Sequence, residues 1–125
     1  MVDKRKFKDI NVSLLGLGTM RLPCETEQKR ESNRNIDYDK AQSLVDLAYK
    51  NGVNYFDTAY MYCGGKSESI IKKALVERYP RDSFTLTTKL PQWMMEEGID
   101  GRDRIFNEQL SLIHISEPTR PRLIS

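Results

Sequence analysis

Three side chains suited to proton transfer stand at the ends of two strand-like runs: Asp57, Tyr62 and Lys89. Asp57 ends the run VNYFD, Tyr62 follows it on the next loop, and Lys89 ends SFTLTTK. A phenol titrates near pH 10, too high for easy proton exchange at neutral pH. An ammonium group beside it stabilises the phenolate, and a carboxylate behind the ammonium keeps it charged and oriented. This trio predicts a general acid that protonates a carbonyl oxygen while hydride reaches the carbon.

Spacing alone leaves other roles open for the same residues. An aspartate at a strand end often caps a turn, and a lysine there is often simply solvated. The chain also has six tyrosines, so the presence of Tyr62 is not informative by itself. The elements that position the three residues therefore matter more than their types.

Strand and helix patterns alternate along the chain. A short apolar run predicts a strand over Val12–Leu17. A helix is then predicted from its cap at Asp37 to a C-terminal glycine, Gly52. The apolar positions expected on its buried face are Ala41, Leu44, Val45 and Ala48.

The same alternation continues after Gly52. VNYFDTA, residues 53–59, predicts a strand, and Ser67 is expected to cap a helix that ends before Pro80. SFTLTTK, residues 83–89, predicts another strand, and a further helix is expected over Gly101–Leu110. The apolar residues assigned to the two helices are Ile71, Ala74 and Leu75, and then Ile105 and Phe106.

Alternating strands and helices indicate right-handed βαβ units and a parallel α/β sheet, either open and doubly wound or closed as a (β/α)8 barrel. The dinucleotide fingerprint fails because Arg21 replaces its third glycine in GLGTMR. GGKS resembles the end of a phosphate loop, but Tyr60 replaces the first glycine of that motif. In a parallel barrel, Asp57, Tyr62 and Lys89 would gather at one face.

Composition indicates a soluble globular chain and argues against several partner classes. Hydrophobic residues make up 38% and charged residues 30% of its 125 residues, and the net charge is +2. Such a charge predicts no nucleic acid or membrane partner, and no signal peptide or membrane-length apolar run is visible. Cys24 and Cys63 form neither a disulfide framework nor a metal-ligand pattern. We therefore expect a cytoplasmic protein without a metal ion at this site.

Three segments together resemble the aldo/keto reductase family. VNYFDTAYMYCGGKSE resembles the family signature, and LGLGTMRLP and FTLTTKLP are similar to the first and third strands of its barrel. The resemblance covers about Phe7 to Leu110. It implies about three βα units from the N-terminal portion of a (β/α)8 TIM barrel, which is incomplete in this chain.

The resemblance also implies function. Members of this family bind NADPH or NADH without a Rossmann domain and reduce aldehydes and ketones reversibly. By position, Tyr62 is the general acid/base, Lys89 its activator and Asp57 the partner of the lysine, also at the cofactor. Gly18, Thr19 and Met20 resemble the loop near the nicotinamide. DTAYMYCGGKSE and RIFNEQL are similar to a branch that often carries a C-terminal ferredoxin-like iron–sulfur segment, which implies an iron–sulfur cluster and ferredoxin-like redox coupling as expectations for the parent protein.

Other residues near these motifs have weaker interpretations. Trp93 is expected either at a substrate pocket or over the core, with neither favoured. Cys63 is interpreted as a small filler rather than a nucleophile. Ser67 and Glu68 are interpreted first as a helix start and second as cofactor contacts.

The last sixteen residues, LSLIHISEPTRPRLIS, break the pattern of the chain. LSLIHISEPTR can be encoded by the end of a transposase-based sequencing adapter, and the frame continues through its index into Ile124 and Ser125. We therefore expect residues 1–110 to be a truncated reductase barrel and residues 111–125 to be a non-native, translated tail. The family's carbonyl-binding histidine is then absent, because the third helix has barely started at Leu110 and His114 follows four residues later, without the roughly ten residues of helix, turn and strand that the resemblance implies between them. The alternatives are a genuine disordered end or a short docking peptide.

A truncated barrel has physical consequences. Three strands leave two open sheet edges, and inward side chains such as Leu15 and Phe56 lose the layers that should bury them. We expect the chain alone to be inactive and unfolded, aggregated or molten. The alternative from another functional class is a genuine short protein that binds a partner through its open strand edge.

Overall fold

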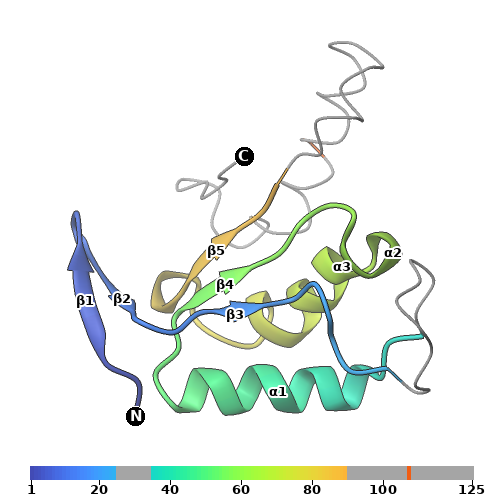
Figure 1. The fold of residues 1–125 in the computed structure, drawn as a ribbon, viewed down its shortest axis with the longest axis horizontal. Helices are drawn as coiled ribbons and strands as arrows, with labels where there is room; N and C mark the ends of the chain where they lie inside the picture. The colour runs from blue at the N-terminus through green and yellow to red at the C-terminus, as the bar shows by residue number, and fades with distance from the viewer. Residues whose placement is uncertain (25–34, 90–106, 108–125) are drawn as a thin grey trace.

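The computed structural model describes residues 1–24, 35–89 and 107, and these residues form two small sheets and a helical layer (Figure 1). An antiparallel hairpin comes first, followed by a three-stranded parallel sheet in the order β3-β4-β5. The strands are β1 (Lys4–Phe7), β2 (Ile10–Ser13), β3 (Leu17–Gly18), β4 (Tyr55–Asp57) and β5 (Thr85–Thr87). The helical elements are α1 (Tyr38–Lys50), α2 (Tyr62–Gly65), α3 (Ser67–Ile71), the π-helical turn η1 (Lys72–Val76) and the 3-10 turn η2 (Arg81–Ser83).

The parallel sheet predicted from the alternation of elements is confirmed, but the first strand is not where the apolar run placed it. The expected strand Val12–Leu17 is divided between β2, which pairs with β1 in the hairpin, and the short β3. Leu14 and Leu15, which lie between β2 and β3, are 61% and 60% exposed. Apolar composition located the segment, whereas the backbone pairing with β1 set the strand boundary.

Helix α1 follows the prediction closely. The Asp37 carboxylate accepts a hydrogen bond from the backbone N–H of Lys40 at 3.1 Å, which satisfies one free donor of the first turn. Ala41 and Val45 are fully buried on the face toward the sheet. Gly52 has a φ of +94°, a left-handed conformation that ends the helix as predicted.

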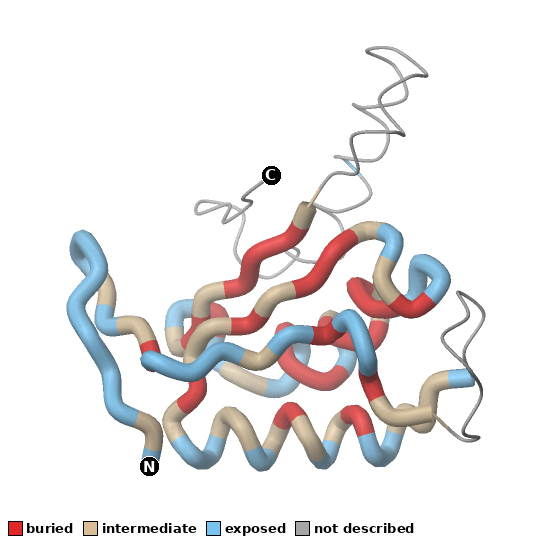
Figure 2. Tube along the Cα trace, viewed as in Figure 1, coloured by how far each residue is buried: buried red, intermediate tan, exposed pale blue. Residues whose placement is uncertain are grey.

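Alternation along β4 decides which side chains meet the helices. Phe56 is fully buried with Leu86 of β5 in a core cluster that includes Ile71, Leu75 and Val45 from the helical layer. Figure 2 shows buried segments along β4 and β5 and along the helical elements. The expectation that Phe56 points into a barrel was therefore wrong: Tyr55 and Asp57 lie on the other face of β4, because successive side chains alternate.

The second predicted helix exists but starts differently. Lys66 occupies the cap position of α3, and no side chain caps it, so the prediction that Ser67 caps this helix was wrong. The Ser67 hydroxyl instead contacts threonines at the strand ends. Continued by η1, the helix buries Ile71, Ala74 and Leu75 as expected and ends before Pro80.

Two further expectations concern residues outside the described part. The predicted helix over Gly101–Leu110 lies there except for Asn107, and so does Trp93. In the part that the structure describes, no helix is long and apolar enough to cross a membrane.

Candidate active site at the carboxyl ends of the strands

The three parallel strands end side by side and place Asp57 at the centre of their common edge. Gly18 of β3 pairs with Asp57, and Asp57 pairs in turn with Thr87 of β5. Thr87 donates its hydroxyl proton to the Asp57 carboxylate at 2.8 Å. Because the strands are parallel, the segments that follow them leave from the same edge.

Lys89 lies directly over this carboxylate. Its ammonium donates to both Asp57 oxygens at 2.8 Å each and to the Thr58 carbonyl at 3.1 Å. Burial lowers the pKa of Lys89, but hydrogen bonds to Asp57 and to the Tyr62 side chain, with attraction to both, raise it above its ordinary value overall. The site therefore holds a lysine that stays charged through neutral pH.

Tyr62 reaches the same ammonium from the loop after β4. The Lys89 nitrogen lies 4.9 Å from the centre of the Tyr62 ring. The structure thus brings together the three residues that the sequence motif singled out, from β4, the following loop and the end of β5. Asp57 and Lys89 keep 36% and 44% of their side-chain surface exposed, so the cluster remains open to a ligand.

A left-handed turn presents Tyr62. In α2, Cys63 has φ 56° and Gly64 has φ 65°, conformations that favour glycine at the second position and are uncommon for cysteine. The Cys63 side chain is buried, and its thiol lies 3.5 Å from the Thr19 carbonyl and 3.7 Å from that of Met20. Cys63 therefore packs the tyrosine loop against the segment after β3, which agrees with its interpretation as a filler.

The predicted cofactor loop follows β3 at the same edge. Gly18 is exposed, with open space where a Cβ would stand, and Met20 is 59% exposed. Thr19 is fully buried, and its hydroxyl donates to the Asp57 carbonyl at 2.9 Å. Gly18 and Met20 are thus available to a ligand beside Asp57, whereas the Thr19 side chain is engaged within the protein.

Sequence reasoning missed the hydroxyl groups that hold the site together. Thr58, Thr87 and Ser67 all bond to the strand-end residues, and Thr88 donates to the buried Glu68 carboxylate at 2.8 Å. The sequence contained a signal for these groups in TTK and DTA. A threonine next to a charged residue at a strand end brings a hydroxyl group that needs a hydrogen-bond partner when it is buried. In the structure Ser67 and Glu68 are 0% and 2% exposed, so their side chains face the protein rather than a ligand.

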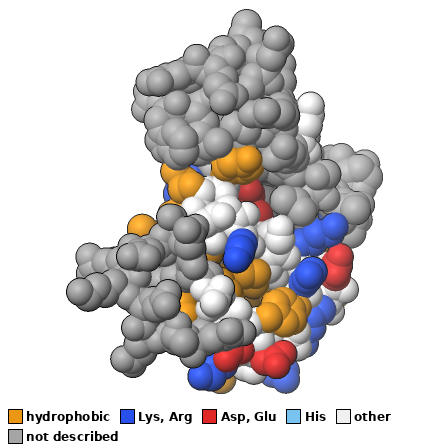
Figure 3. Space-filling view, turned by 90° about the vertical axis from the view of Figure 1, so that its right-hand side faces the viewer, with side chains coloured by type: hydrophobic (Ala, Val, Ile, Leu, Met, Phe, Trp, Pro, Cys, Tyr) orange, Lys and Arg blue, Asp and Glu red, His pale blue; other side chains and the backbone are white. Residues whose placement is uncertain are grey.

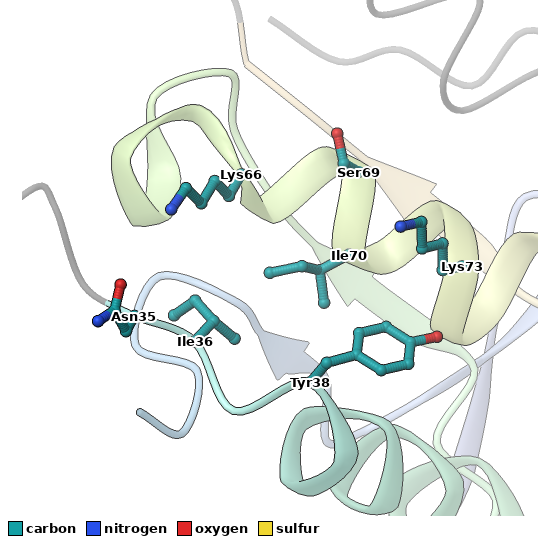
Figure 4. A pocket seen from close by; sticks show the side chains of 7 residues that line it. All are labelled: Asn35, Ile36, Tyr38, Lys66, Ser69, Ile70 and Lys73. Carbon is teal, nitrogen blue, oxygen red and sulfur yellow. The ribbon is translucent and has the colours of Figure 1, made fainter. Parts of the chain in front are cut away.

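A separate pocket, the outer pocket, lies between the segment that leads into α1 and the helix formed by α3 and η1. Its volume is about 500 Å³, and Figure 4 shows the side chains around it. They are Asn35, Ile36, Tyr38, Lys66, Ser69, Ile70 and Lys73. Figure 3 views the molecule from the side to the right of Figure 1, where Lys and Arg side chains lie among apolar ones. None of the three site residues lines this pocket.

Among residues 1–24, 35–89 and 107, no group of three or more His, Cys, Asp or Glu side chains could hold a metal ion. The chemistry available at the strand ends is instead that of a phenol, an ammonium and a carboxylate. The profile of the aldo/keto reductase family matches residues 14–117 of the chain. The chain belongs to the aldo/keto reductase family.

Solved aldo/keto reductases resemble the chain over most of its length. One from Bacillus halodurans, in its holo form, is 27% identical, with a TM-score of 0.66, and the match covers 91% of this chain and 37% of that one. One from Brucella melitensis is also 27% identical, with a TM-score of 0.57 and coverage of 90% and 38%. One from Klebsiella pneumoniae in complex with NADPH is 23% identical, with a TM-score of 0.57 and coverage of 91% and 36%.

The likeness identifies the fold. The chain is the N-terminal part of the TIM barrel of the aldo/keto reductases, and it spans less than two fifths of the length of these three structures. The barrel interpretation is therefore confirmed over the open doubly wound sheet. The family match extends beyond Leu110 to residue 117, and His114 lies outside the described residues.

Proposed function

We propose that the parent protein reduces aldehydes or ketones with NADPH or NADH and that Tyr62 is its general acid. The observation that carries this proposal is the placement of the Lys89 ammonium between the Asp57 carboxylate, at 2.8 Å, and the Tyr62 ring, at 4.9 Å. The substrate class and the cofactor are supported by the family to which the chain belongs.

Each residue has a distinct task in this mechanism. A bound nicotinamide cofactor would supply the hydride that adds to the carbonyl carbon. Tyr62 donates its phenolic proton to the carbonyl oxygen, so that an alcohol forms and a phenolate remains. Lys89 stabilises this phenolate through its positive charge, and Asp57 holds the ammonium in place through both carboxylate oxygens. Solvent returns the proton to Tyr62 before the next cycle, and alcohol oxidation follows the same path in reverse.

The exposed groups at the strand ends fit a nicotinamide. Met20 offers an apolar surface, Gly18 leaves open space beside it, and Asp57 presents a partly exposed carboxylate. An amide and a flat ring match this combination of acceptor and apolar groups. We include Gly18, Met20 and Asp57 in the cofactor site. Thr19 supports Asp57 through the hydrogen bond from its hydroxyl to the Asp57 carbonyl.

Other features of the parent stay predictions. They are the iron–sulfur segment with its ferredoxin-like coupling, the cytoplasmic location and the inactivity of the 125-residue chain. The boundary between a reductase over residues 1–110 and a translated adapter over residues 111–125 also stays a prediction. Sequencing the source DNA across the codon for Leu110, with primers well outside it, tests that boundary.

The test of the proposed function is NADPH consumption by the complete parent protein with a set of small aldehydes and ketones. We expect one alcohol formed for each cofactor oxidised, and a loss of about 10²- to 10⁴-fold in kcat on Tyr62→Phe. Full turnover by the Tyr62→Phe variant would exclude Tyr62 as the general acid. No consumption with any carbonyl compound, in a folded protein that binds NADPH, would exclude the reaction class.

A further inference from the structure

A chain of buried hydroxyl groups runs beneath the candidate active site. The Ser67 hydroxyl lies 2.7 Å from that of Thr19 and 2.8 Å from that of Thr58. The Thr19 hydroxyl continues the chain to the Asp57 carbonyl at 2.9 Å. All three side chains are fully buried, with 0% of their surface exposed.

The number of protons on the hydroxyl groups determines which of them donates in each hydrogen bond of this hydroxyl chain. Each hydroxyl has one proton to donate. Thr19 gives its proton to the Asp57 carbonyl, which accepts but cannot donate, so Ser67 must donate to Thr19. The Thr58 hydroxyl is then the donor to Ser67. The order is Thr58 to Ser67 to Thr19 to Asp57, with every bond pointing the same way, an arrangement in which each bond strengthens the next.

The two ends of the chain are neighbours in sequence and both hold Lys89. Asp57 binds the lysine ammonium through its carboxylate, and Thr58 binds it through its carbonyl. The hydroxyl chain therefore begins at Thr58 and ends at Asp57, the dipeptide that positions the ammonium. Ser67, from α3, connects its two halves. A shift of this dipeptide moves the ammonium relative to the phenol.

Ser67 also begins the helix that follows the Tyr62 loop. Through Ser67 the start of α3 is hydrogen-bonded to Thr19, which follows β3, and to Thr58, which follows β4. The next residue, Glu68, accepts a hydrogen bond from Thr88, which follows β5, at 2.8 Å. The turn that carries Tyr62 lies between β4 and this anchored start. Lys89 and Tyr62 are thus held by the same buried contacts.

We propose that Ser67 is a positioning residue that holds Lys89 and Tyr62 in register for proton transfer. This inference rests on the proposed reductase function. Ser67 touches neither substrate nor cofactor, because its side chain is fully buried, and it acts through Asp57, Thr58 and the Tyr62 turn.

The directed chain predicts an order among substitutions. Ser67→Ala leaves the buried Thr58 donor and the Thr19 acceptor without their partner, whereas Thr58→Val removes a donor and leaves only an acceptor of Ser67 unused. Unsatisfied buried donors are the costlier defect. We expect kcat of the complete parent enzyme to fall about tenfold for Ser67→Ala and about threefold or less for Thr58→Val. Ser69→Ala is the matched control, since Ser69 lies on the same helix and lines the outer pocket, and its kcat should stay within about twofold.

The pH dependence of kcat distinguishes positioning from general stability. Displacing the ammonium removes support for the phenolate, so the basic limb of carbonyl reduction should move to higher pH in Ser67→Ala and not in Ser69→Ala. KM for NADPH should change little, because the exposed residues Gly18 and Met20 are untouched. Loss of folded enzyme would lower the rate at all pH values without moving the limb.

Measurements on Tyr62→Phe in parallel separate the two claims. If Tyr62→Phe is inactive while Ser67→Ala, normalised to folded protein, keeps both kcat and the pH profile of the unchanged enzyme, the positioning role is wrong and the proposed function stands. A larger loss for Thr58→Val than for Ser67→Ala would overturn the direction of the hydroxyl chain. If Tyr62→Phe keeps full activity, the proposed function itself fails.

Discussion

Two clusters in this chain contain side chains of the same three classes and differ in how these are connected. At the strand ends, Asp57, Lys89 and Tyr62 meet. Between α1 and the segment after η1, the guanidinium of Arg78 donates to both oxygens of Asp46 at 2.6 and 3.0 Å, and the Tyr79 hydroxyl donates to the same carboxylate. Each cluster thus joins a carboxylate, a cation and a phenol.

The difference lies in what the phenol touches. Tyr79 donates to a carboxylate and stacks on Tyr49, with ring centres 3.9 Å apart, and burial together with the bond to Asp46 raises the pKa of Tyr79. Tyr62 instead lies beside the Lys89 ammonium, which is 4.9 Å from the centre of its ring. In general an anion beside a phenol favours its neutral form, whereas a cation favours the phenolate that the proposed reaction forms. Connectivity, rather than composition, separates the cluster proposed to be catalytic from the structural one.

The largest difference between the clusters is expected on removing the cation. Lys89→Met in the complete parent enzyme should lower kcat by about 10²-fold or more, because the phenolate formed during reduction loses its charge partner. Arg78→Met should leave kcat within about twofold and lower the melting temperature instead. Steady-state kinetics and thermal unfolding of both variants check this contrast. Equal losses of kcat in the two variants would contradict it.

Removing the carboxylate should have a smaller effect on rate. Asp57→Asn keeps the shape of the side chain and removes the charge that holds Lys89, so we expect kcat to fall about tenfold. Asp46→Asn is the matched control and should leave kcat unchanged within about twofold. If both asparagine variants kept the original kcat, the Asp57–Lys89 contact would have no role in the reaction.

Thr87 tests the support of Asp57 from β5. Its hydroxyl donates to one Asp57 carboxylate oxygen at 2.8 Å, and the Lys89 ammonium donates to the same oxygen, so Thr87→Val removes one of two hydrogen bonds there without changing charge. We expect a decrease of about threefold in kcat with little change in KM for the carbonyl substrate. A change in KM alone would place Thr87 in substrate binding rather than in orienting Asp57.

The smallest expected difference between the two clusters concerns stability at acid pH. Its direction follows from the pKa of Asp46. Bonds from Arg78, and also from Tyr79, hold the pKa of Asp46 below its ordinary value near 4. The contribution of Asp46 to stability is therefore present above the unfolded-state pKa and is lost as the pH falls through the lower folded-state pKa. Because the pair is partly exposed, the loss should be only about 1–2 °C in melting temperature. Asp46→Asn should remove this dependence, which thermal unfolding between about pH 6 and pH 2 measures.

Sequence patterns predicted the parts of this molecule that depend on local signals. Asp37 and Gly52 delimit α1 because capping is decided within a few residues. Asp57 and Lys89 were brought together correctly because parallel strands end at one edge. Tyr62 needed the family motif, since its position depends on a left-handed turn through Cys63 and Gly64 that spacing does not show.

The failures share a different cause, which is contact with segments outside the run of residues that was interpreted. Val12–Leu17 was assigned to one strand because its apolar run does not show that β2 pairs with β1. Phe56 was assigned to the wrong face because parity along a three-residue strand depends on where pairing starts. Ser67 was expected to cap its own helix, whereas its partners are residues 9 and 48 positions away. Such contacts become visible only when the strand ends are assembled.

The most direct test of the central claim compares two tyrosines in one enzyme. Tyr62→Phe and Tyr79→Phe each remove a single phenolic oxygen from a cluster with a carboxylate and a cation. Carbonyl-dependent oxidation of NADPH by the complete parent protein is measured for both variants, with thermal unfolding to confirm that each is folded. We predict that Tyr62→Phe loses at least about 10²-fold in kcat while Tyr79→Phe keeps the original rate. Equal activity of the two folded variants would contradict the account.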